Sequence, residues 1–119
     1  MFLQLAHKKL EVVLLSRQIV IEVYKLTRLL PNEEKYAMAS QLRRAALSIH
    51  LNIAEGCSRR SASERKRFFE IARGSLIEVE AAIEVAIELE YLKTGTLETV
   101  GPKLVSCFRL LSKLITNTN

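Results

Sequence analysis

The chain has 119 residues, of which 49% are hydrophobic and 26% charged, and its formal net charge is +5. This length is enough to bury one core without disulfides or a structural metal, and the composition excludes a disordered protein. No stretch approaches the roughly 18 uninterrupted apolar residues that a membrane span needs.

Apolar residues recur at steps of three and four from Val12 to Leu30, and this period predicts an amphipathic helix that ends near Leu30. The segment Pro31-Asn32-Glu33-Glu34 interrupts the pattern. We expect Asn32 to cap a second helix that follows at once, with the two glutamates in its first turn.

The second helix is predicted from a stripe with spacing three, four, three, four. Gly56 is expected to end it, because a C-cap often needs a residue in the left-handed conformation. The stripe consists of Ala39, Leu42, Ala46, Ile49 and Ile53.

Ser61 and Glu64 form a capping-box pattern, so a third helix is expected to begin near Ala62 and to continue to Thr94-Gly95-Thr96. Small residues on this helix, with Gly74 nearby, predict a close approach of another backbone. The last helix starts either at Thr96 with a kink or near Pro102 as a first-turn proline.

Four helices with short connections predict an all-α fold, an antiparallel up-down-up-down four-helix bundle, forming a single domain over residues 1–119. The first and third helices carry more apolar surface than a monomeric bundle buries, so we expect a homo-oligomer.

Cys57 and Cys107 have neither a CxxC spacing nor a nearby histidine pair, so we expect two reduced thiols, with a disulfide between them as the alternative. The N-terminal charges follow a short apolar run, the reverse of a secretory signal. We therefore expect a cytoplasmic protein without a membrane segment, cofactor or metal.

A set of motifs lies between Pro31 and Glu78: Pro31, Glu34 and Tyr36, the run from Gln41 to Gly56 with its Asn52-Ile53-Ala54-Glu55-Gly56 motif, Ser63, Phe69, Ile71, Ala72, Gly74, Ser75 and Glu78. In these residues the sequence resembles the bacterial S23 or 23S rRNA intervening-sequence proteins, and it is similar to the accessory variability proteins of diversity-generating retroelements. The similarity extends from about Leu5 to Leu92 and implies a small bundle that assembles into a ring, a pentamer, with a basic surface for nucleic acid.

The positive charge of the chain is concentrated in its first 75 residues. Residues 1–75 carry 14 basic and 7 acidic residues, whereas residues 76–119 carry 4 and 6. A basic cluster at the expected joint of the second and third helices can replace counterions along a phosphate backbone, so it predicts nucleic-acid binding, of RNA rather than DNA. The ordinary alternative is a solvated helix start. The cluster consists of Arg59, Arg60, Arg65, Lys66 and Arg67.

Further polar residues on the second and third helices are assigned structural roles. An internal ion pair with Glu78 is expected for Arg43 or Arg44, with surface contacts as the alternative. Asn52, Glu55 and Ser75 are expected to form a polar network that ties the second helix to the third.

Two other functions stay open. Arg44 and His50 have the spacing of the Arg-x(4 to 6)-His signature of helical HEPN-type ribonucleases, which makes a metal-independent ribonuclease a weak alternative to a non-enzymatic protein. No Glu-x-x-His motif of a carboxylate-bridged metal bundle is present. The other alternative is an adaptor that docks a protein such as a reverse transcriptase through the basic edge.

Overall fold

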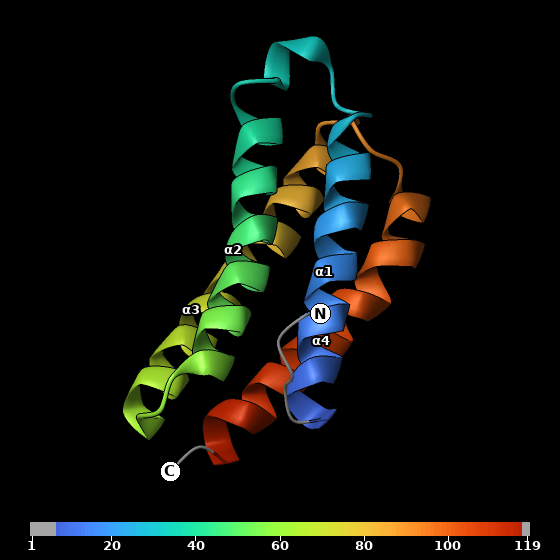
Figure 1. The fold of residues 1–119 in the computed structure, drawn as a ribbon. Coiled ribbons are helices and arrows are strands. Elements are labelled where there is room, and N and C mark those ends of the chain that lie inside the picture. Colours follow the sequence, from blue (N-terminus) through green and yellow to red (C-terminus); the bar gives the residue numbers. More distant parts are fainter. Residues whose placement is uncertain (1–6, 118–119) are drawn as a thin grey trace.

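Four helices form most of the computed structural model, which describes residues 7–117. They are α1 (His7–Thr27), α2 (Met38–Ser58), α3 (Ala62–Glu88) and α4 (Leu97–Asn117). Two 3-10 turns, η1 (Asn32–Glu34) and η2 (Thr94–Thr96), lie in the connections at one end, and the α2–α3 connection lies at the other (Figure 1). The predicted all-α up-down-up-down bundle is confirmed.

The predicted apolar stripes build the core. All five stripe residues of α2 are buried, and those of α1 are buried except for the half-buried Leu15. The contact between α2 and α3 is the most extensive, whereas α4 packs less extensively against α3 and α1. The resulting bundle measures 43 × 25 × 24 Å.

The expected start of the second helix is wrong. α1 ends at Thr27 rather than near Leu30, Asn32 begins η1, and α2 begins only at Met38. The carboxylate of Glu34 accepts a hydrogen bond from the Met38 amide at 3.4 Å, so this side chain serves the helix terminus in place of Asn32.

The expected role of Gly56 as a C-cap is also wrong. α2 continues to Ser58, and no glycine within residues 7–117 has a positive φ. Gly56 lies instead where Phe69 of α3 crosses α2, and a Cβ at this position would be 2.6 Å from Phe69 Cε1. The residue is a glycine because the helices approach closely here.

Gly74 does not have the packing role expected of it, because a Cβ there would meet open space. Ala72, another small residue of α3, is fully buried.

α3 ends earlier than expected, at Glu88. Glu90 adopts a positive φ of 63°, and the amides of Tyr91 and Leu92 both donate to the Ala86 carbonyl, at 2.9 and 3.3 Å. Such bonds satisfy carbonyls at a helix end. Helix α4 then starts directly after Thr96, the first of the two predicted alternatives, and contains Pro102.

None of the helices within residues 7–117 combines the length and apolar character that crossing a membrane requires.

Candidate nucleic-acid interface

The connection between α2 and α3 is short and locally bonded. Ser61 is the N-cap of α3, and its hydroxyl accepts a hydrogen bond from the Glu64 amide at 3.3 Å. In a complete capping box the Glu64 side chain would also bond back to the Ser61 amide, but this bond is not formed within residues 7–117. The Ser61 hydroxyl instead pairs with that of Ser63 at 2.9 Å. On the other side, the Ser58 hydroxyl donates to the Glu55 carbonyl at 2.8 Å. These bonds fix the geometry of the connection that carries the basic cluster.

Arg59 is held in place by two contacts. Its Nη2 lies 2.8 Å from the carboxylate of Glu55, one turn earlier, and its guanidinium lies 4.9 Å from the centre of the Phe68 ring. Both partners of the ion pair are about half exposed, so it contributes little to stability. Its effect is to neutralise part of the charge of Arg59.

Arg65 supports the connection by bonding to its backbone. Its Nη1 donates to the carbonyl of Arg59 at 3.2 Å and also to the carbonyl of Arg60. The side chain is half-buried. Arg65 therefore closes the turn, and its removal would alter the shape of the whole cluster.

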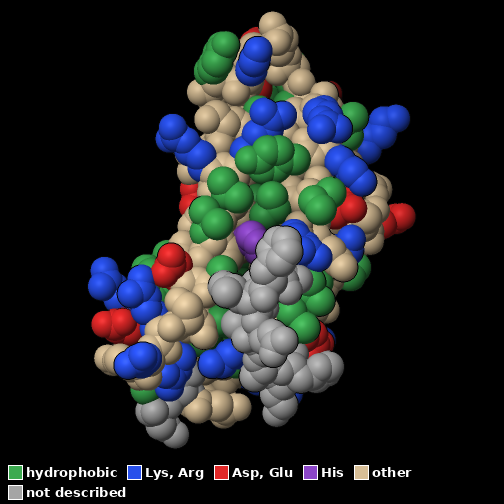
Figure 2. Space-filling view, in the orientation of Figure 1, with side chains coloured by type: hydrophobic (Ala, Val, Ile, Leu, Met, Phe, Trp, Pro, Cys, Tyr) green, Lys and Arg blue, Asp and Glu red, His purple; other side chains and the backbone are tan. Residues whose placement is uncertain are grey.

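The other three cations of the cluster, Arg60, Lys66 and Arg67, are exposed. Their side chains make no hydrogen bond or ion pair within the described part of the chain. Basic side chains gather at this end of the molecule (Figure 2). The structure thus separates the predicted cluster into two residues that shape the joint and three whose charge is available to a partner.

The predicted polar network forms in part, through a residue that was not predicted. The Ser48 hydroxyl accepts a hydrogen bond from the Asn52 side chain at 3.1 Å and shares one with the Ser75 hydroxyl at 2.8 Å. Glu55 lies outside this network, because it pairs with Arg59.

The expected ion pair of Arg43 or Arg44 with Glu78 is wrong. Gln41 donates to the Glu78 carboxylate instead. Arg43 turns toward α1, where its Nε donates to Thr27 at 2.8 Å, and Arg44 is exposed without an ion pair in residues 7–117. The pairing with Glu78 was predicted from the positions of the residues along the hairpin of the second and third helices. Neighbouring side chains compete for the same carboxylate, and Gln41 is the one that bonds to it.

His50 is half-buried between α1 and α2, where its Nδ1 pairs with the hydroxyl of fully buried Ser16 at 2.8 Å. Burial, together with the positive charge of Arg17, lowers the pKa of His50 below its usual 6.5. Arg44 lies about 120° away around the helix, since each residue advances about 100°. The two residues of the ribonuclease signature therefore do not converge on one site.

Buried Ser16 was not predicted. It lies four residues after Val12 and three before Ile19 on the core stripe of α1, so its position in the stripe was the available signal. A hydroxyl at such a position needs a partner in the core, and His50 supplies it.

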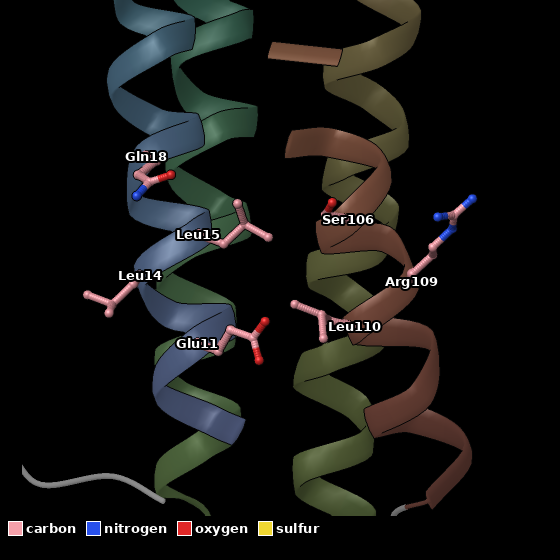
Figure 3. Close-up of a pocket in the computed structure, with 7 residues that line it drawn as sticks. All are labelled: Glu11, Leu14, Leu15, Gln18, Ser106, Arg109 and Leu110. Carbon is pink, nitrogen blue, oxygen red and sulfur yellow. The ribbon is translucent and has the colours of Figure 1, made fainter. Parts of the chain in front are cut away.

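A groove between α1 and α4 has a volume of about 560 Å³. Leu15 and Leu110 approach across it with the Glu11 carboxylate beside them, whereas Arg109 points away (Figure 3). None of its lining residues is a histidine or a cysteine. No group of three potential metal ligands occurs within residues 7–117.

Both cysteines are free and buried. Burial raises the pKa of Cys57 and raises that of Cys107 to about 12. The thiols are therefore protonated at neutral pH and are poor nucleophiles.

Comparison with known proteins places these features in context. A family model described as 23S rRNA-intervening sequence protein matches residues 8–113. A crystal structure of a protein of unknown function from the S23 ribosomal protein family of Bacteroides thetaiotaomicron is similar, with a TM-score of 0.84 and 26% identity over 92% of this chain and 99% of that one. No curated protein matches.

Proposed function

The chain belongs to the 23S rRNA-intervening sequence protein family, and on this basis we propose that it is a non-enzymatic, homo-oligomeric protein that binds structured RNA through the α2–α3 joint. Arg60, Lys66 and Arg67 contact the phosphates, while Arg59 and Arg65 hold the joint in shape.

One observation carries this proposal: three exposed cations without an acidic partner in the described part of the chain lie in, or within two turns after, a connection that is fixed by side-chain bonds. Lysine and arginine in such a position displace counterions from a phosphate backbone and bind without reading the sequence. Because the connection is already ordered, binding carries little cost in backbone conformational entropy there.

Exposed apolar side chains support the homo-oligomer. Ile77 of α3 and Val105 of α4 are each about half exposed, and Phe108 of α4 retains 37% exposure. These three residues line one shallow apolar site, and a second copy of the chain would remove it from water. In a ring, which we propose is a pentamer, the basic joint would repeat, so weak contacts would add through multivalency.

The binding of a labelled structured RNA tests the proposal, measured by fluorescence anisotropy at about 50 and 200 mM salt. The variant Lys66→Gln with Arg67→Gln should weaken binding and flatten the dependence of affinity on salt by about one unit of slope for each phosphate interaction that is removed. The control, Lys25→Gln with Lys93→Gln, removes the same charge from exposed positions away from the joint and should have a much smaller effect.

Equal weakening in the two variants would show that net charge, and not the joint, governs binding. Absence of binding at about 50 mM salt would refute the RNA proposal. The adaptor alternative, in which the joint docks an acidic protein surface, would then remain.

A further inference from the structure

A second basic site lies between α1 and the start of α2, away from the joint. It is a hollow of about 300 Å³, and three of its seven lining residues are cations while none is acidic. An anion that enters it therefore meets only positive charge. The lining residues are Tyr24, Lys35, Tyr36, Ser40, Arg43, Arg44 and Leu47.

Arg43 is already oriented within this hollow. Its Nε donates to the Thr27 hydroxyl at 2.8 Å, and its guanidinium lies 5.2 Å from the centre of the Tyr24 ring. Thr27 is itself fixed, because its hydroxyl donates to the Tyr24 carbonyl at 2.7 Å. The terminal nitrogens of Arg43 make no hydrogen bond within residues 7–117, so they can take a phosphate in a forked contact.

Tyr36 adds a flat apolar surface beside the cations. Tyr36 is 88% exposed, and the Lys35 ammonium lies 5.4 Å from the centre of the Tyr36 ring. An exposed ring with a cation beside it can stack a nucleobase while the cation attracts the adjacent phosphate.

The nearest acidic residues along the chain lie outside the hollow. Glu33 and Glu34 are not among the lining residues. Glu34 is bonded elsewhere, to the Tyr91 hydroxyl at 3.2 Å and to the Met38 amide at 3.4 Å.

We infer that this hollow binds one nucleotide, with the phosphate held by Arg43, Arg44 and the Ser40 hydroxyl and the base stacked on Tyr36. The site is separate from the joint, since Arg44 and Arg59 are about 22 Å apart along α2 at 1.5 Å per residue. The nucleotide can be free or part of a strand, because both present the same phosphate and base.

Tyrosine ring signals give a direct test, because the chain has three tyrosines and two of them line the hollow. Protein labelled with ¹³C at tyrosine is titrated with adenosine monophosphate, with a short single-stranded RNA and with inorganic phosphate. We expect the signals of Tyr24 and Tyr36 to shift with either nucleotide ligand, while that of Tyr91 remains in place. Binding by adenosine monophosphate identifies a free nucleotide as sufficient, whereas binding by RNA alone identifies a strand.

Arg44→Gln should weaken this binding about tenfold, as the removal of one charge-assisted hydrogen bond implies. The matched control Lys113→Gln removes an exposed charge near the end of α4 and should leave it unchanged. The titration is repeated in Lys66→Gln with Arg67→Gln, so that binding at the joint and binding at the hollow are measured separately. Phosphate binding as strong as nucleotide binding, no shift with any ligand, or equal effects of Arg44→Gln and Lys113→Gln would each overturn the inference.

Discussion

Gly56→Ala should destabilise the protein even though alanine is the better helix former. In an unhindered helix, this replacement stabilises by about 0.5 to 1 kcal/mol. Here the added Cβ would lie 2.6 and 2.8 Å from Cε1 and Cδ1 of Phe69, and the ring is only 1% exposed, so it cannot move aside into solvent. Overpacking of this kind costs about 1 to 3 kcal/mol. Subtracting the helix gain leaves a net decrease in stability of about 0 to 2.5 kcal/mol, and we expect the upper half of this range because the ring is enclosed.

Gly74→Ala is the matched control, since it places the same methyl group in α3 with no packing partner within 4 Å outside the adjacent residues and the surrounding helix backbone. It should stabilise by about 0.5 to 1 kcal/mol. Urea unfolding followed by circular dichroism would measure both variants, at one fixed protein concentration because the proposed assembly would contribute to apparent stability. A second change, Phe69→Leu, should relieve the clash, so the double variant should be destabilised by less than the sum of the two single effects.

The opposite order would refute the close approach of α2 and α3 at Gly56. If Gly56→Ala were as stable as Gly74→Ala, or if Phe69→Leu and Gly56→Ala were simply additive, the helix crossing would have room for a methyl group.

Three further predictions concern the joint, the half-buried His50 and the buried thiol of Cys107. Arg65→Ala should lower the free energy of unfolding by about 1 kcal/mol, because the carbonyls of Arg59 and Arg60 lose their donor. Arg67→Ala should leave the free energy of unfolding unchanged. Equal stabilities of the two variants in urea unfolding would contradict the bracing role of Arg65. Because burial and Arg17 lower the pKa of His50, the folded state binds fewer protons than the unfolded state, so stability should decrease as the pH falls through 6.5. His50→Gln should reduce this dependence of stability on pH. An unchanged pH profile in the variant would show that His50 is not its source. Burial raises the pKa of Cys107 to about 12, so at about pH 8 only ~10⁻⁴ of this residue is thiolate. Cys107 should therefore react with a thiol reagent far more slowly in the folded protein than in the urea-unfolded protein. Similar rates in the two states would show that Cys107 is accessible in the folded protein.

The fold was predictable from the sequence because helical periodicity is a local property. The stripe of α2 and the start of α3 at Ala62 are where the spacing and the Ser61 cap predicted them. Gly56 was misinterpreted because a glycine near a helix end suggests a cap, whereas its actual reason is a ring on another helix. That contact is tertiary and leaves no local pattern.

The candidate site was predictable only as a group of residue types. Charge counting predicted the basic cluster at the joint, but it could not distinguish Arg65, which bonds backbone carbonyls, from Arg67, which is exposed. The expected pair of Arg43 or Arg44 with Glu78 does not form, and the Glu78 carboxylate accepts a hydrogen bond from Gln41 instead. Competition among side chains of similar reach is decided by rotamers and by the crossing of the helices, which the sequence does not display.

The less extensive packing of α4 implies a gradient of local opening along the bundle. Amide hydrogens of α4 should exchange with solvent sooner than those in the centre of α2 and α3, because fewer tertiary interactions must break to expose them. The outer side of α4 also carries Val105 and Phe108. A second copy of the chain bound at this side would slow amide exchange in α4. The exchange rate of this one helix would therefore measure whether the proposed homo-oligomer forms.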